Sequence, residues 1–380
     1  QEIRAGKVTL WDHCFELPHK HLEADKIIPD SFQAGTVAHQ LKVGGADKLE
    51  LYDYPGAYAQ RFDGIDRGGG DQAGNLQKIF EDNKRTTNIR LQEEAAGALR
   101  IHGGSDCPQM HPGFKFTLER HFDADGNYLL TQVSHNARQS ANYRSAASET
   151  LEYSNSFECM PLVVPFRPQR GTPRPTVRGS QTAVVVGPAG EEIFTDKYGR
   201  VKVQFHWDRE GKNDADSSCW IRVATMWAGR NWGMIHIPRI GQEVVVDFLE
   251  GDPDQPIVVG NVFNADQMPP WSLPDNKTQS GIQTRSSPGG AGANCNQIRF
   301  EDKTGAEQVH IHAEKNRDIE VENDETHWVG HDRKKTVDND ETVHVKHDRT
   351  ETVDNNETIT AGANRSEKVV VNETIAVGGD

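Results

Sequence analysis

The chain has 380 residues, of which 35 % are hydrophobic and 26 % charged, and its net charge is −15 at neutral pH. This length allows about two to four domains, and the composition excludes a disordered tail. Without a concentrated basic patch, the acidic balance excludes nucleic acid as a partner. The 5 Cys residues stand singly with no CxxC pair, which excludes a disulfide scaffold and favours assembly in a reducing cytoplasm. No apolar run reaches the length of a transmembrane helix.

Residues 1–165 are predicted to form one mixed domain. Its strands are expected in segments that alternate or run apolar between Gly, Pro and Asp turns, such as "KVTLWDHCFEL", "LKVGGADKLELYDYPGAY" and "FKFTLERHF". Good helix formers without Pro predict one helix inside residues 75–100. The chain starts within a pattern and lacks an initiator Met, so we expect an N-terminal truncation.

Residues 166–265 are predicted to form a small β-barrel. A Pro- and Arg-rich stretch around 166–178 marks the boundary, and short apolar strands such as "TAVVVGPAG" and "PIVVGNVFN" follow at close spacing. About five or six strands in this space are typical of a Greek-key barrel such as the OB-fold. Residues 266–308 are predicted to form a linker and a strand that leads into a repeat.

Residues 309–380 consist of nine gapless octads counted from Val309. The fifth position is always Val or Ala, and the eighth is always Asp or Asn. An eight-residue period with one constant apolar position does not fit a coiled coil. The enrichment in Thr, Val and Asp or Asn favours a short strand that ends in a turn.

The first position of the octads alternates in charge from Arg317 through Glu325 and Arg333 to Glu373. If the strands stack, these side chains form a ladder of opposite charges, each pair contributing about 0.2–1 kcal/mol. The alternation also penalises a shift by one octad, so it fixes the register.

One Val per octad is too little to bury a core within a single chain, so we expect the octads to associate with other chains. With threefold symmetry, the apolar side chains of positions three and five would meet on an axis and form a triple-stranded β-helix, or β-prism. The alternative is a β-solenoid closed by one chain, while calcium-binding nonapeptide repeats have the wrong period. The predicted trimer core comprises Ile311, Ala313, Ile319, Val321, Val329, Val337, Val343, Val345, Val353, Ile359, Ala361, Val369, Ile375 and Val377.

Histidines of the repeat are the candidates for a metal site. His310 and His312 form an HxH pattern, but we interpret them as exposed strand residues. His327 occupies position three beside Val329, so three copies on a threefold axis would offer a site for a metal or an anion. His331 and His347 are predicted to lie in solvated turns.

Other reactive residues are interpreted without catalysis. Glu250, Asp252 and Asp254 resemble a glycosidase carboxylate set, but Gly and Pro around them predict a tight turn. Cys219 is interpreted as a core thiol, and nothing nearby completes a nucleophilic site around Cys107 and its neighbour His111. No phosphate loop, dinucleotide fingerprint or G-x-S-x-G motif appears. The sequence therefore predicts no catalytic residue and no cofactor.

Four segments carry a resemblance to a known family. They are "LYDYPGAY" (51–58), "GPAGEEIFTDKYGRVKVQFHWDREG" (187–211), "SSCWIRVATMWAG" (217–229) and "IPRIGQEVVVDFLEGDPDQPIVVGNVFN" (237–264). Together with the octads they resemble VgrG, the trimeric spike protein of bacterial type VI secretion systems, which is related to the spike and hub proteins of contractile phage tails. The resemblance implies a mainly β protein: the end of a tail-hub-like β-barrel region with a helix, an OB-fold barrel and a trimeric β-helical needle. The first hub barrel of the family is expected to be missing here.

The resemblance also implies a mechanical function. A homotrimer of this kind is expected to sit on the baseplate, cap the Hcp tube, carry a PAAR-type tip protein and effectors, and pierce target membranes without a transmembrane segment. It would assemble in the bacterial cytoplasm and then be translocated into target cells. Two alternatives stay open: an enzyme-bearing spike whose effector or lysozyme domain lies outside this chain, and the spike of a phage tail or an extracellular injection system.

Overall fold

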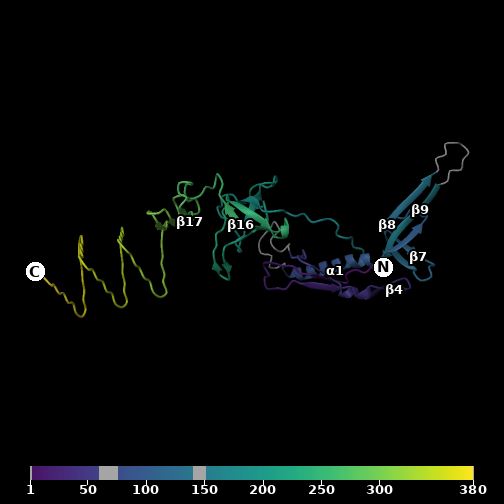
Figure 1. Ribbon diagram of the computed structural model, residues 1–380, viewed down its shortest axis with the longest axis horizontal. Coiled ribbons are helices and arrows are strands. Elements are labelled where there is room, and N and C mark those ends of the chain that lie inside the picture. The colour runs from purple at the N-terminus through teal and green to yellow at the C-terminus, as the bar shows by residue number, and fades with distance from the viewer. Residues whose placement is uncertain (1, 60–75, 140–150, 380) are drawn as a thin grey trace. The chain divides into compact units, whose positions relative to one another are not determined.

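The computed structural model describes residues 2–59, 76–139 and 151–379 (Figure 1). It divides into two compact units, Gln1–Asn316 and Arg317–Asp380, which are considered separately here. Across the described ranges, strands far outnumber helices, which confirms the predicted mainly β class. None of the described helices is both long and apolar enough to cross a membrane.

The first unit begins with a three-stranded sheet in the order β2-β1-β5 and a separate hairpin, β3-β4. The bounds are β1 (Lys7–Leu10), β2 (Ala24–Ile27), β3 (Ser31–Ala34), β4 (Val37–Gln40) and β5 (Glu50–Asp53). The segment before β5 was expected to be extended, but Val43–Lys48 forms a 3-10 helix, η1. Gly44 and Gly45 there have positive φ angles of 64° and 77°, which a strand does not use.

The predicted helix is confirmed as α1 (Ile79–Ala98), which continues from a 3-10 turn, η3 (Leu76–Lys78). It packs against β1 and β2. Ile79 and Leu91 of the helix join Val8, Leu10 and Leu22 in one buried cluster. The buried side of the helix also includes the polar residues Asp82, Asn83 and Thr87, so only a few apolar side chains pack into the cluster.

A four-stranded antiparallel sheet follows, in the order β6-β9-β8-β7. Its strands are β6 (Ile101–Ser105), β7 (Lys115–Leu118), β8 (Gly126–Gln139) and β9 (Leu151–Pro161). Tyr128, Leu130 and Cys159 form its buried centre. The far part of the long β8-β9 hairpin exposes mainly polar side chains, as expected for a ribbon with solvent on both faces.

The predicted OB-fold is confirmed as a closed five-stranded barrel. Its strands are β10 (Gln181–Val186), β11 (Lys202–Phe205), β12 (Arg222–Val223), β15 (Glu243–Phe248) and β16 (Pro256–Val262). Neighbouring strands in the sheet follow the order β11-β10-β15-β16-β12. An antiparallel bridge between Val201 and Ile221 joins the two ends and closes the barrel. Alternate Val side chains fill the interior, so the "VVV" runs of β10 and β15 follow the period of two that the sequence shows.

Two further elements lie between strands of the barrel in the sequence. A short hairpin, β13 (Ala228–Gly229) and β14 (Trp232–Gly233), lies between β12 and β15, and a 3-10 turn, η4 (Leu249–Gly251), lies between β15 and β16.

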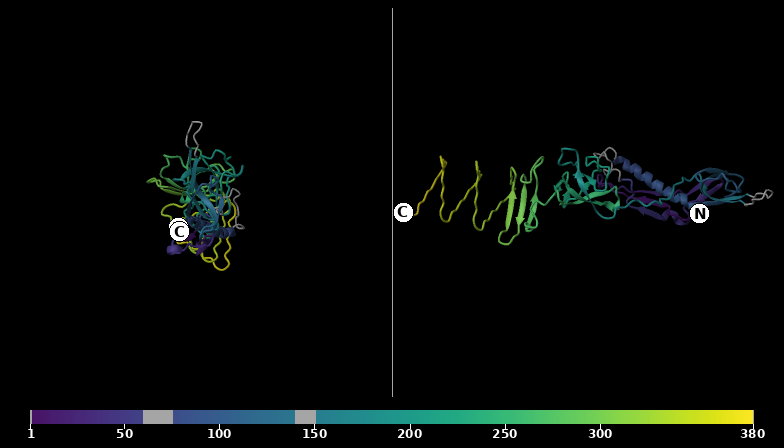
Figure 2. Two further views of the ribbon diagram at one scale, coloured as in Figure 1. Left: turned by 90° about the vertical axis from the view of Figure 1, so that its right-hand side faces the viewer. Right: turned by 90° about the horizontal axis from the view of Figure 1, so that it is seen from above.

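A second small sheet occupies the segment that was expected to be a linker with one strand. It has the antiparallel order β17-β18-β19, with β17 (Gln279–Gln283), β18 (Gln297–Glu301) and β19 (Gln308–His312) (Figure 2). Ile282, Ile298 and Ile311 lie opposite one another across the three strands and are all exposed. The Pro, Gly and Ser residues lie in loops between these strands. The sequence thus predicted the loops correctly but not the short strands around them.

The second unit has a different character. Within its described residues, 317–379, no strand is assigned and every residue is exposed. Its chain runs as an open zigzag whose successive arms do not pair with each other (Figures 1 and 2).

Candidate functional site

The octad segment bends once per repeat. In the eight octads from 309 to 372, the bends fall at positions six and seven, for example at 322–323, 338–339 and 354–355. The prediction placed the turn at the Asp or Asn of position eight, so the bend lies one or two residues earlier. His331 and His347 lie within such bends, as predicted.

Within the single chain, the position-five side chains are less exposed than the position-three side chains. From Val321 to Val369, the valines of position five are 45–50 % exposed. Ile319, Val343 and Ile359 at position three are 60–64 % exposed. Atoms of the same chain thus cover about half of each position-five valine, and the other half is left for another surface to bury.

The remaining predicted core residues lie toward the two ends of the repeat in the sequence. Ile311 lies on β19 and Ala313 directly follows it, while Ile375 and Val377 near the chain end are more exposed than the inner octads. Whether these side chains meet on a threefold axis stays a prediction, because such a core takes residues from three chains.

Position three has a regularity that the prediction treated as mixed. In octads that begin with Glu it is His327, Val343, Ile359 or Ile375, whereas in octads that begin with Arg it is Lys335, Glu351 or Glu367 after an initial Ile319. The true repeat therefore spans two octads. The pattern is visible in the sequence when position three is compared with position one of the same octad.

The ion pairs of the octad segment differ from the predicted ladder. Arg349 binds Glu351 at 2.7 Å and Arg365 binds Glu367 at 3.2 Å, and Lys335 binds Glu341. Among residues 317–379, charges at position one thus pair with position three and not with position one of the next octad. The reason is geometric: successive arms of one chain are not side by side, so a ladder would need arms from neighbouring chains.

The histidine candidates lie apart. On β19 the rings of His310 and His312 stack with their centroids 6.4 Å apart, and His310 is opposite Arg299 in register, where a cation would be repelled. His327 Nε2 lies 2.6 Å from Glu325 Oε1 in the same octad. Among the described residues, no three His, Cys, Asp or Glu side chains gather as metal ligands. A site on a threefold axis would take one His327 from each chain, so it stays a prediction.

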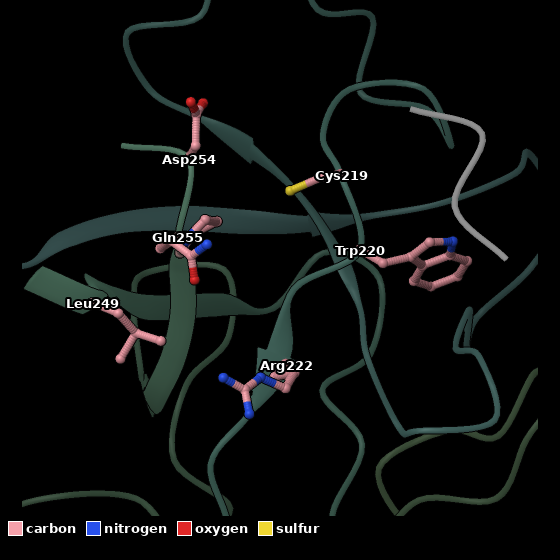
Figure 3. Close-up of a pocket in the computed structure, with 7 residues that line it drawn as sticks. Cys219, Trp220, Arg222, Leu249, Asp254 and Gln255 are labelled. Atoms are coloured by element: carbon pink, nitrogen blue, oxygen red, sulfur yellow. The ribbon is translucent and has the colours of Figure 1, made fainter. Parts of the chain in front are cut away.

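The acidic turn after β15 has the local role that the sequence predicted. Asp252 is paired with Arg174 at 3.4 Å, and its Oδ1 accepts a 3.0 Å hydrogen bond from the backbone N–H of Asp254. Glu250 lies within η4 at a positive φ of 55°. Cys219 lines a small pocket beside this turn, where burial raises the pKa of its thiol. Figure 3 shows the Cys219 thiol and the Trp220 indole directed to opposite sides of the chain.

A larger cavity of about 170 Å³ is lined by residues that no sequence motif groups together. It is lined by Asp12, His13, Tyr54, Pro55, Arg222, Leu249, Glu250, Asp252 and Gln255. They come from four separate parts of the chain, 12–13, 54–55, 222 and 249–255, so no spacing in the sequence signals them. The carboxylates of Asp12 and Asp252 are already engaged, since Asp12 Oδ2 accepts 2.9 Å hydrogen bonds from the N–H groups of Tyr58 and Ala59.

The Cys107 and His111 pair does not extend into a nucleophilic site. The carbonyl of Cys107 accepts a hydrogen bond from Asn155 Nδ2 at 2.8 Å, and the His111 ring packs near His135 with centroids 6.1 Å apart. Tyr153 Oη and His135 Nδ1 are 2.5 Å apart. These contacts tie the 106–113 loop to the β8-β9 ribbon, which is a structural role.

Three family models match consecutive parts of the chain. The phage tail baseplate hub family (GPD) matches residues 1–141, and the type VI secretion system/phage-baseplate injector OB domain matches residues 184–263. The bacteriophage T4 gp5 C-terminal trimerisation domain matches residues 280–380, which include β17, β18, β19 and the octads.

Curated relatives agree with these matches. The chain is 49 % identical to the type VI secretion system spike protein VgrG1b of Pseudomonas aeruginosa, over 88 % of this chain and 41 % of that protein. For VgrG1c and VgrG1a of the same organism the identities are 47 % and 42 %, over 88 % and 87 % of this chain and 42 % and 47 % of those proteins. The chain thus spans less than half the length of these relatives. A solved E. coli protein, c3393, a component of the type VI secretion system, has 20 % identity and a TM-score of 0.33, over 51 % of this chain and 44 % of that one. Over 87–88 % of its length, the chain is therefore similar to VgrG spike proteins of type VI secretion systems.

Proposed function

We propose that this chain forms a homotrimeric, cell-puncturing spike of a type VI secretion apparatus. The observation that carries the proposal is the half-exposed column of position-five valines in a segment without internal strand pairing. A single chain leaves this column in water, and one apolar side chain per octad stabilises the segment only when other chains cover it. The match of residues 280–380 to a trimerisation domain supports three chains.

The mechanics of a spike follow from such an assembly. Three chains that wind around a shared valine column pair their backbone groups with one another, so no sheet edge is left open along the length. The outer positions carry Arg, Lys, Glu and Asp, which limits apolar patches that adhere to a membrane. A closed, charged rod of this kind resists bending and unfolding when it is pushed through a target membrane.

The partners belong to the same proposal. The trimer would sit on the baseplate, cap the Hcp tube and carry a PAAR-type tip protein and effectors, and it would be assembled in the cytoplasm and translocated with them. The support is that the relatives are named spike proteins of type VI secretion systems. No catalytic step is proposed for this chain, since its acidic turn and its Cys107 loop have structural contacts.

Absolute mass in solution tests the proposal. One chain has a mass of 42.3 kDa, so a trimer has three times this mass and light scattering after size exclusion separates the two. We expect a trimer that elutes early for its mass. A folded monomer at micromolar concentration would refute the proposed spike. Release of fragments from peptidoglycan by the purified chain would instead favour an enzyme-bearing spike.

A further inference from the structure

The β13-β14 hairpin exposes the most concentrated group of large apolar side chains on the barrel. Trp227 and Trp232 are 62 % and 56 % exposed, and Met226 and Ile235 beside them are more exposed still. We call residues 225–235 the tryptophan hairpin. A cluster of four exposed large apolar side chains indicates an interaction site, and Trp is among the side chains most enriched in residues that dominate binding.

The tryptophan hairpin is held rigidly before any partner arrives. The two indoles meet edge to face with ring centroids 4.9 Å apart. The backbone N–H of Met234 donates to the Trp227 carbonyl at 2.9 Å, and the Thr225 hydroxyl donates to the Met234 carbonyl at 2.6 Å. A Cβ on Gly229 would lie 2.1 Å from Cε2 of Trp232, so this glycine leaves the space for the indole. A fixed aromatic surface loses little conformational entropy when it binds.

The charge of the tryptophan hairpin points to an acidic partner. Residues 225–235 contain Arg230 and no carboxylate, whereas the whole chain has a net charge of −15. A second copy of this chain has 57 Asp and Glu against 42 Lys and Arg, so it offers carboxylates that can pair with Arg230.

The position of the hairpin also favours a second copy. The barrel is tied to the start of the region that matches a trimerisation domain: Glu192 accepts hydrogen bonds from the Ser287 hydroxyl at 2.7 Å and the Gly289 N–H at 2.6 Å. Arg239 Nη2 donates to the Arg285 carbonyl at 2.8 Å. When three copies join through the β17-β18-β19 part of this region, these bonds hold their barrels close to one another as well.

We infer that the tryptophan hairpin of one copy docks on the barrel of a neighbouring copy and forms a second inter-chain contact, apart from the octads. The inference rests on the proposed trimer. It assigns the exposed indoles to the interface between barrels, where they are buried in the assembled spike.

The test compares the double variant Trp227→Ala/Trp232→Ala with the matched control Trp207→Ala. Trp207 lies on the same barrel, is 65 % exposed and stacks on Phe205 of its own chain. Mass photometry of a dilution series in a fixed, sub-denaturing guanidinium concentration gives the concentration at which the trimer dissociates. We expect this concentration to rise about tenfold or more for the double variant, the effect of losing a packed aromatic anchor. The control is expected to stay within about twofold of the wild type.

A second measurement leaves both indoles in place. The photo-reactive residue p-benzoylphenylalanine at position 235 replaces only Ile235, and irradiation is expected to join two copies of the chain on a denaturing gel. A wild-type chain that is monomeric would overturn the proposed spike and this inference together. A wild-type trimer whose double variant behaves like Trp207→Ala, or whose position 235 joins no second copy, would overturn the inference alone.

Discussion

Replacement of Val345 by Asp tests the orientation of the octads most directly. Val345 is 47 % exposed in the single chain, so association in a trimer has about half of the side chain left to bury. Full burial of a Val contributes about 1.5 kcal/mol, which gives about 0.7 kcal/mol per chain and about 2 kcal/mol for the three chains. A buried polar group without a partner adds about 1–3 kcal/mol, or about 3–9 kcal/mol for three copies.

Val345→Asp is therefore expected to destabilise the trimer by about 5–11 kcal/mol, whereas Val345→Ala should cost about 2 kcal/mol or less. The matched control is Val370→Asp, because Val370 lies at position six, within a bend, and is 85 % exposed. Denaturant unfolding followed by circular dichroism, with light scattering to report the trimer, measures all three variants. Equal stability of Val345→Asp and Val370→Asp would show that position five does not face a shared core.

Two further predictions concern titratable groups. Hydrogen bonds from the Ser287 hydroxyl and then the Gly289 N–H hold the pKa of Glu192 below its ordinary value of 4.5, so the carboxylate stabilises the fold above pH 4.5 and loses this contribution as the pH falls below it. Glu192→Gln should therefore flatten the fall in melting temperature between pH 5 and about pH 3. An unchanged pH profile would contradict the contact. Burial raises the pKa of the Cys159 thiol to about 11. Iodoacetamide at neutral pH should therefore label the exposed Cys107 of the native protein and leave Cys159 unmodified, as measured by mass spectrometry. Equal labelling of both thiols would contradict the burial of Cys159.

Local patterns in the sequence predicted several elements correctly. The run of helix formers gave α1, and the alternating valines of 181–186 and 243–248 gave two central strands of the barrel. The eight-residue period located the bends of the repeat to within two residues. These features depend on neighbours in the chain, where helix propensity, the period of two and turn-forming residues act directly.

Other features required contacts between distant segments. The three short strands of the β17-β18-β19 sheet were hidden by the loop residues between them, and η1 replaced an expected strand where two glycines adopt positive φ. The predicted charge ladder needs stacked strands, and in the single chain the charges of position one pair with position three instead.

The sequence by itself determined the mainly β class, the helix, the barrel and the octad repeat, because each is encoded by a period or a propensity within a short window. Only the tertiary structure decided how the barrel closes through Val201 and Ile221, which carboxylates the Arg and Lys side chains select, and that the indoles of Trp227 and Trp232 are fixed at the surface. These outcomes depend on contacts between residues that are distant in the sequence. The free energy of such contacts is set by packing and desolvation, which local sequence patterns do not specify.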